Sequence, residues 1–165
     1  MRKNGFFISP SVGKLTVEKM VDELASFMNE DPLSSYRLVI GTDSKSQGVK
    51  KGRGLDLVTA VVIHRQGKGG RYFWQKKRKE KINSLRDKIY TETLSSLDLA
   101  ELLVPQFQKR LNGERYELEI HIDVGQNGPT REMIKEVVGM VNGNGYTAKT
   151  KPESYGASVV ADKHT

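Results

Sequence analysis

The sequence predicts a buried strand that ends at a carboxylate, in Leu38-Val39-Ile40-Gly41-Thr42-Asp43. A second such strand comes later, in Leu118-Glu119-Ile120-His121-Ile122-Asp123, where alternation gives one apolar and one polar face. Polar sequence that contains glycine follows each carboxylate. Sheets that combine strands with helices place their active sites beyond the carboxyl ends of the strands. Asp43 and Asp123 are therefore the first candidates for a functional site.

The apolar spacing predicts further elements around these two strands. A helix is expected over residues 16–29, and Asp31-Pro32 stops it. After it the pattern predicts strands over 37–43, 55–64 and 71–79, a helix from Ser84 to Leu103 that Pro105 kinks or ends, a strand over 116–123, a helix from Gly128-Pro129 to residues 142–145, a strand over 146–150 and a brief helix over 156–162. The first three strands should form an antiparallel meander. We expect one domain, residues 1–165, with residues 1–36 as an N-terminal extension.

Composition narrows the class of partner. Of 165 residues, 27 are Lys or Arg and 20 are Asp or Glu, so the formal charge is +7 and the pI is about 9.5. This balance favours a polyanion, either nucleic acid or an acidic membrane surface. The sequence has no apolar run of about 18 residues that would cross a membrane, and the absence of cysteine excludes disulfides and thiolate metal ligands. We therefore expect a cytoplasmic protein without a disulfide partner.

The element order over residues 37–165 resembles that of the ribonuclease H-like superfamily, with acids on the first strand, the following helix, the fourth strand and the last helix. Three stretches are similar to the YkuK-type bacterial family within it: Ile40-Gly41-Thr42-Asp43-Ser44-Lys45-Ser46, His121-Ile122-Asp123-Val124-Gly125 and Ala157-Ser158-Val159-Val160-Ala161-Asp162. The resemblance implies an α/β fold, in which helices flank a mixed five-stranded sheet and the N-terminal helix is an addition. It also implies a site for two Mg²⁺ or Mn²⁺ ions, held by Asp43, Glu92, Asp123 and Asp162.

The chemistry of such a site is phosphodiester hydrolysis. Hard divalent cations prefer oxygen ligands, and two ions about 3.5–4 Å apart hold the attacking water and the leaving oxygen in line. Without metal, converging carboxylates repel one another, which raises some of their pKa values. By the resemblance, Asp43 bridges both ions. Glu92 and Asp123 hold one of them and Asp162 holds the other, while His164 is a candidate for proton transfer or product release.

Each acid also has a purely structural explanation. Asp43, between Thr42 and Ser44, suits an Asx turn at a strand end, and the same holds for Asp123. Glu92 on a helix suits a solvated face, with Asp98 and Glu101 as nearby alternatives. The metal site is indicated by the set of acids in the expected element order, and not by any one of them.

Two basic stretches are candidates for nucleic-acid contacts. Residues 71–81 interleave aromatic and cationic side chains, which can stack on bases and neutralise phosphates. An edge strand guarded by lysines explains them equally well. The second stretch follows Asp43 and is also explained as a solvated hairpin tip. The candidate contacts are Lys45, Lys51, Arg53, Trp74, Lys76, Lys77 and Arg78.

The sequence supports two main hypotheses. The first is a metal-dependent nuclease, a hydrolase that cleaves RNA, an RNA/DNA hybrid or structured DNA. The second is a non-catalytic nucleic-acid-binding or regulatory module, because a fold does not fix a function. A third is an interaction protein whose basic face meets an acidic protein. The basic protrusion by which ribonucleases H grip hybrid duplexes is not evident in the short connection at residues 111–115, so general phosphodiester hydrolysis is favoured over hybrid cleavage.

Overall fold

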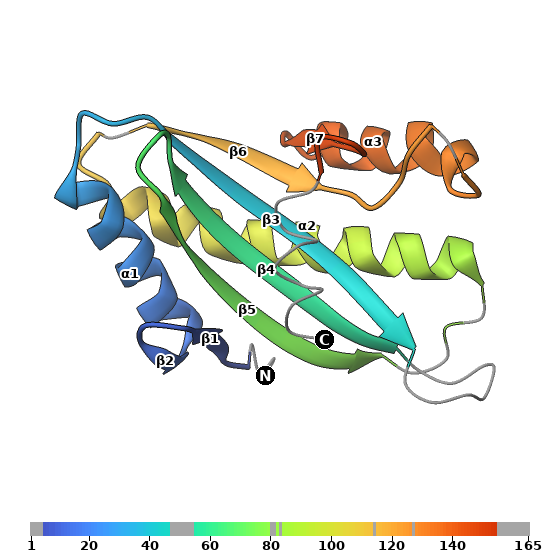
Figure 1. The fold of residues 1–165 in the computed structure, drawn as a ribbon, viewed down its shortest axis with the longest axis horizontal. Coiled ribbons are helices and arrows are strands. Elements are labelled where there is room, and N and C mark those ends of the chain that lie inside the picture. Colours follow the sequence, from blue (N-terminus) through green and yellow to red (C-terminus); the bar gives the residue numbers. More distant parts are fainter. Residues whose placement is uncertain are drawn as a thin grey trace.

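The structure is a computed structural model, and it describes residues 5–46, 55–79, 82, 84–113, 115–126 and 128–154. Figure 1 shows how the helices and strands are arranged in space. Along the chain the elements are β1 (Phe7–Ser9), β2 (Gly13–Leu15), α1 (Val17–Glu30), β3 (Tyr36–Ser46), β4 (Leu55–Arg65), β5 (Gly70–Lys79), α2 (Leu85–Arg110), β6 (Tyr116–His121), a 3-10 helix (Arg131–Met133), α3 (Ile134–Gly143) and β7 (Thr147–Lys149).

The strands form one mixed sheet in the order β2-β1-β5-β4-β3-β6-β7. β3, β4 and β5 form the predicted antiparallel meander, while β6 runs parallel to β3, and β7 parallel to β6. The α/β, ribonuclease H-like architecture is thus confirmed, with all five predicted strands present. The sheet has seven strands because the N-terminal extension adds the hairpin β1–β2. Strands of three residues are too short to show an alternating pattern, so the sequence does not predict this hairpin.

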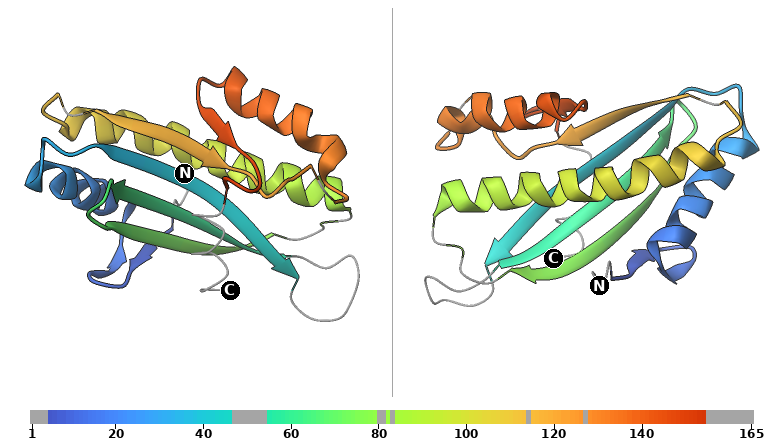
Figure 2. Two further views of the ribbon diagram at one scale, coloured as in Figure 1. Left: turned by 45° about the horizontal axis from the view of Figure 1, so that its top comes forward. Right: turned by 180° about the vertical axis from the view of Figure 1, so that it is seen from behind.

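Two helices cover one face of the sheet. α1 and α2 lie across the side that is turned toward the viewer in the right panel of Figure 2, and α3 lies beyond β6, beside β7. α2 begins where it was predicted, and Ser84 caps it by accepting a hydrogen bond at Oγ from the Asp87 N–H. It continues through Pro105 to Arg110, so Pro105 does not end it. Phe107, two residues later, is fully buried, and its packing offsets the backbone hydrogen bond that proline cannot make.

The region after β6 departs from the expected helix. Gly128 has a φ of 134°, a conformation that does not belong to a helix and that favours glycine. Residues 128–130 therefore form a turn, and α3 begins only at Ile134, after the short 3-10 helix. The brief helix expected over residues 156–162 lies outside the described residues.

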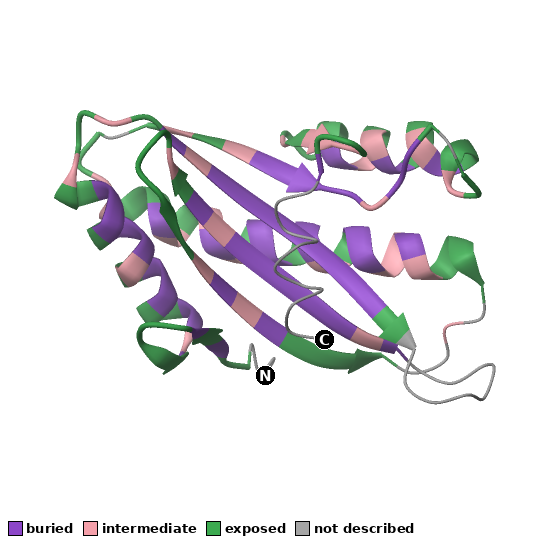
Figure 3. Ribbon diagram, viewed as in Figure 1, coloured by how far each residue is buried: buried purple, intermediate pink, exposed green. Residues whose placement is uncertain are grey.

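The two faces of the sheet carry different side chains. Successive residues of a strand alternate between faces. Ile40 belongs to the core beneath α1 and α2, and Thr42 and Ser44 hydrogen-bond to α2. We call this side the helix face. The alternate residues of β3, among them Gly41 and Asp43, project to the opposite side, the second face. Figure 3 shows that buried residues line most of β3 and β4.

Phe107 should be one of the main sources of stability. Its side chain is fully buried in α2, and its ring lies 4.8 Å from the ring of Tyr116, at the start of β6. We expect Phe107→Ala to lower the free energy of unfolding by about 3–5 kcal/mol in a urea titration. Leu94→Ala, on the same helix but 48% exposed, should change it by no more than about 0.5 kcal/mol. Equal effects of the two substitutions would contradict this packing.

Candidate functional site

The parallel pairing of β3 with β6 brings Asp43 and Asp123 toward the same end of the sheet. Asp43 does not end its strand as predicted, because β3 continues to Ser46 and Asp43 itself pairs with Val58 of β4. Gly41 pairs with His121 in this register, and Asp43 and Asp123 each follow by two residues. The two acids therefore lie just beyond the same pair of residues. Asp43 is buried, and the Asp123 side chain is 26% exposed. The structure thus brings together the two acids that the strand patterns single out.

Glu92 of α2 approaches the same end of β3 from the helix face. Ser44 Oγ donates a hydrogen bond to Glu92 Oε2 at 2.5 Å. One turn further along α2, Ser96 Oγ lies 2.8 Å from Thr42 Oγ1. These two buried contacts hold α2 against β3. They place Glu92 beside the residue that directly follows Asp43.

Burial dominates the electrostatics of Glu92. Its side chain is 3% exposed, and this desolvation raises its pKa from the usual 4.5 to about 7. The Ser44 hydrogen bond and the charge of Lys88, 3.8 Å away, lower the pKa, while the charges of Asp43 and Asp123 raise it. Glu92 Oε1 is buried and makes no hydrogen bond to the described residues. An unpaired buried oxygen is costly, so Glu92 offers a ligand atom for a cation.

A lysine that the sequence pattern does not single out lies in the same cluster. Lys151 Nζ is 2.8 Å from Asp123 Oδ1. This hydrogen bond and the charge of Asp123 raise the pKa of Lys151, and the charges of Asp43 and Glu92 add to the effect. Lys151 follows β7, and its N–H donates to the Val124 carbonyl oxygen at 2.8 Å. The register of β7 on β6 would identify this lysine, but the sequence does not reveal that register.

The carboxylates do not gather into one set of ligands. Within the described ranges, no three Asp, Glu or His side chains are grouped closely enough to hold one metal ion. The alternation of β3 explains the separation, because Ser44 meets Glu92 on the helix face whereas Asp43 projects from the second face. Asp162 and His164 lie outside the described residues. Carboxylate oxygens nevertheless suit a hard divalent cation, and the unpaired Glu92 Oε1 fits one.

Lys76 lies in the same cross-strand row as Asp43. It pairs with Val58 on β4, which in turn pairs with Asp43. Directly paired residues project to the same face, and two strand spacings separate the two backbones by about 10 Å. Lys76 is exposed. Lys76 thus presents a cation on the second face in the row of Asp43, which is itself buried.

The other predicted nucleic-acid contacts divide between the two faces. By the same alternation, Trp74, Arg78 and Lys45 belong to the second face, where Arg78 Nη1 is 3.7 Å from Asp56 Oδ1. Lys77 pairs with Leu57, opposite Ser44, and projects from the helix face. Two further candidates, Lys51 and Arg53, lie outside the described residues.

Comparison with known proteins gives the family. The family model "Ribonuclease H-like" matches residues 19–165. The chain belongs to the ribonuclease H-like family. It is also 33% identical, over 181 aligned positions, to "Uncharacterized protein YkuK" of Bacillus subtilis (strain 168), and the alignment covers 100% of this chain and 99% of that protein. It is therefore a YkuK-type member. No solved structure matches the chain significantly.

Membership in the ribonuclease H-like family suggests a nucleic-acid-related function. The charge of +7 agrees with such a partner. Asp43, Glu92 and Asp123 stand on β3, on α2 and just beyond β6, which is the order that the sequence resemblance implies. In the part of the chain that the structure describes, no helix combines the length and the apolar character needed to cross a membrane.

A buried polar chain lies beside these acids in the ribonuclease H-like sheet. Glu119 Oε1 is 3.0 Å from His121 Nε2, and Glu119 Oε2 is 3.2 Å from Arg37 Nε. Burial lowers the pKa of His121, which favours the neutral imidazole. His121 Nδ1 makes no hydrogen bond to the described residues. The alternation of β6 predicts that Glu119 and His121 share a face, but it does not predict that both are buried.

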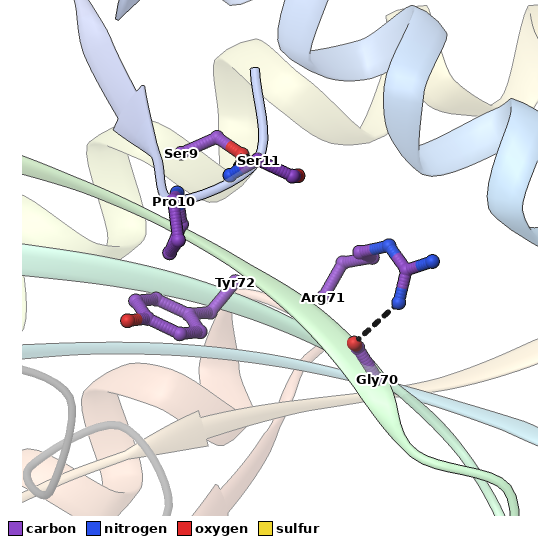
Figure 4. A pocket seen from close by; sticks show the side chains of 6 residues that line it. All are labelled: Ser9, Pro10, Ser11, Gly70, Arg71 and Tyr72. Atoms are coloured by element: carbon purple, nitrogen blue, oxygen red, sulfur yellow. Dashed lines mark hydrogen bonds between the residues drawn. The ribbon is translucent and has the colours of Figure 1, made fainter. Parts of the chain in front are cut away.

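A small pocket lies at the other end of the meander (Figure 4). Its volume is about 230 Å³, and Arg71 lines it with its Nη1 donating to the Gly70 carbonyl oxygen at 3.0 Å. Gly70 pairs with His64, at the end of β4 remote from Val58 and the acids. The full lining is Ser9, Pro10, Ser11, Gly70, Arg71 and Tyr72. This pocket contains no carboxylate and is separate from the candidate metal centre.

The raised pKa of Glu92 predicts a pH-dependent cost to folding in this ribonuclease H-like chain. In the unfolded chain the carboxyl group ionises near pH 4.5, whereas in the folded, metal-free protein it keeps its proton up to about pH 7. Stability is therefore lost as the pH rises from 4.5 through 7. We expect Glu92→Gln to stabilise the protein at pH 8.5 by roughly 1–3 kcal/mol, which raises Tm by several degrees, and to have little effect at pH 5.

Thermal unfolding in the presence of chelator measures this difference. Asp98→Asn is the matched control, because Asp98 is exposed on the same helix. Its effect should be the same at both pH values. Curves of Tm against pH that run parallel for wild type and Glu92→Gln would show that Glu92 ionises normally.

Proposed function

We propose that this chain is a cytoplasmic, divalent-metal-dependent nuclease that hydrolyses phosphodiester bonds of RNA or structured nucleic acid. The observation that carries the proposal is the approach of a buried acid of α2, Glu92, to Asp43 of β3 and to Asp123, just beyond β6. The three lie near enough for the charges of the two aspartates to raise the pKa of Glu92. Membership in the ribonuclease H-like family supports nucleic acid as the partner.

The three acids would hold Mg²⁺ or Mn²⁺ through their carboxylate oxygens, with Asp162 as the proposed fourth ligand. Two bound ions supply a metal-activated water and neutralise the leaving oxygen. The chain itself positions the ligands. Ser44 holds Glu92 by a hydrogen bond, and the pairing of β3 with β6 holds the segments that contain Asp43 and Asp123 side by side.

The second face would bind the nucleic acid. Lys76 shares a cross-strand row with Asp43, and Lys45 and Arg78 extend the same face toward the ends of β3 and β5. Their charges would neutralise phosphates. Trp74, half-buried two residues before Lys76, would offer a stacking surface for a base. A strand bound to these cations would run beside the end of β3 that carries the buried Asp43.

A non-catalytic binding module is the second candidate function. It is favoured by one observation, that the described acids are not grouped closely enough for three of them to hold one ion. Such a module would use the cations of the second face and would not turn over substrate. Cleavage assays separate the two functions directly.

Replacement of Asp43 tests the nuclease. Asp43→Asn keeps the size of the side chain but removes a charged metal ligand, so we expect cleavage to fall by at least about 100-fold, since even the partners that orient metal ligands are worth about 10–100-fold. Binding of nucleic acid should persist. The substrates are labelled single-stranded RNA, duplex DNA, RNA/DNA hybrid and a four-way junction, each with Mg²⁺, Mn²⁺ or chelator.

Asp98→Asn is again the matched control, because it removes the same charge from an exposed position, and it should cleave like the wild type. Full activity of Asp43→Asn would overturn the assignment of the acids. Binding without cleavage by the wild type, for every substrate and metal, would favour the binding module.

Two neighbouring lysines of β5 test the binding face. Lys76 and Lys77 are both exposed but project to opposite faces. We expect Lys76→Gln to weaken nucleic-acid binding several-fold and to reduce the slope of log K against log salt by about 1, because one phosphate contact is lost. Lys77→Gln should change the affinity much less. Trp74 is the single tryptophan of the chain, so its fluorescence can report binding.

An unchanged Trp74 emission in the bound state would place the nucleic acid away from the second face. Equal losses for Lys76→Gln and Lys77→Gln would indicate that binding depends on net charge alone. Either result would remove the support for nucleic-acid binding along the second face.

A further inference from the structure

We propose that Lys151 is an exchangeable counter-ion of the metal centre. In the metal-free protein its ammonium group neutralises Asp123, and a divalent cation binds only when Lys151 gives up that carboxylate. The inference rests on the proposed metal site and concerns how that site is loaded. Lys151 is thereby a positioning and regulating residue that competes with the metal for an oxygen atom.

The backbone directs Lys151 toward Asp123. The N–H of Lys151 donates to the Val124 carbonyl oxygen at 2.8 Å, and two residues earlier the Lys149 carbonyl oxygen accepts from the N–H of Ile122 at 2.9 Å. These bonds extend the pairing of β7 with β6 beyond the strands themselves. Lys151 is thus tied to the segment that contains Asp123, and its Nζ reaches Asp123 Oδ1 at 2.8 Å.

A glycine makes room for the lysine side chain. A Cβ atom at Gly125 would lie 3.2 Å from Lys151 Cβ and 3.5 Å from Lys151 Cδ. The stem of Lys151 therefore runs closely along the bare backbone of Gly125. Backbone pairing, a close approach at glycine and the ion pair all act on one side chain. The Lys151 side chain is 59% exposed, so the backbone pairing and the close approach at Gly125 are what direct it to the carboxylate.

Electrostatics makes the lysine and a metal ion exclusive. The ammonium group pairs with Asp123 at 2.8 Å and also lies in the field of Asp43 and Glu92, so it occupies a place to which all three acids attract a cation. A divalent cation at Asp123 would meet a like charge a few ångströms away. The metal must therefore displace the ammonium group, and part of its binding free energy is spent in breaking the ion pair.

The consequence is that the site binds a divalent cation more weakly than the same carboxylates would without Lys151. A monovalent cation offers no more charge than the ammonium group that it would replace. A divalent cation offers twice that charge and can compete. Removal of the Lys151 charge should accordingly tighten divalent binding, whereas removal of most metal-site residues would weaken it. This opposite sign distinguishes a competing residue from a supporting one.

Binding of Mn²⁺ alone, without nucleic acid, tests the inference. Free Mn²⁺ is followed by its electron paramagnetic resonance signal during titration of wild type, Lys151→Met, Gly125→Ala and Lys149→Met. Methionine keeps the unbranched stem and removes the charge. We expect Lys151→Met to bind Mn²⁺ about tenfold more tightly, equivalent to about 1.4 kcal/mol. Gly125→Ala pushes the lysine stem from Asp123 and should tighten binding about threefold, a fold-change of the size expected for a partial loss of the ion pair.

Lys149→Met is the matched control, because it removes the same charge two residues earlier, where the lysine pairs with His121. It should stay within about twofold of the wild type, a change of less than 0.5 kcal/mol. Lys151→Met binding no tighter than Lys149→Met would overturn the counter-ion exchange while leaving the metal site intact. Absence of Mn²⁺ binding in every variant would overturn the proposed metal site as well. Tightening in both Lys151→Met and Gly125→Ala supports the exchange through two different substitutions.

Discussion

Two buried hydrogen bonds between β3 and α2 set the position of the long helix on the sheet. Most of the contact is apolar, and apolar surfaces tolerate small sliding movements because their attraction has no direction. The contacts of Ser44 with Glu92 and of Thr42 with Ser96 do have a direction, at 2.5 and 2.8 Å. A helix shifted by one residue would leave these polar groups buried and unpaired, which is costly. They therefore fix which residue of α2 meets the end of β3.

The same end of the sheet collects charge from both sides. The helix face supplies Glu92, and the second face supplies Asp43 in a row with Lys76. Asp123 and Lys151 close the cluster from the neighbouring strand. Burial raises the pKa of Glu92, which favours its neutral form, whereas Asp123 forms an ion pair with Lys151. Glu92 and Asp123 are thus stabilised in different ways.

Sequence reasoning succeeds where periodicity is long and fails where register matters. β3, β4, β5 and α2 are predicted because each contains a clear apolar pattern within an element of ten or more residues. Asp43 and Asp123 follow from strand ends, but Glu92 is found only through the family resemblance, because an acid on a helix is usually solvated. Lys151 is missed because its partner depends on how β7 pairs with β6. The opposite faces of Lys76 and Lys77 follow from alternation once β5 is assigned.

The far half of β5 also has a bearing on how the protein behaves in solution. In the described part of the chain, β1 pairs with this strand only at Ile8 and Trp74, so the stretch from Lys76 to Lys79 forms the outer border of the sheet. Exposed borders invite other chains to add strands, and lysines discourage that by repulsion. Neutralising these residues would weaken attraction to polyanions and, at the same time, remove a barrier to self-association. Precipitation of such a variant would then reflect edge-to-edge strand pairing between molecules rather than a misfolded core.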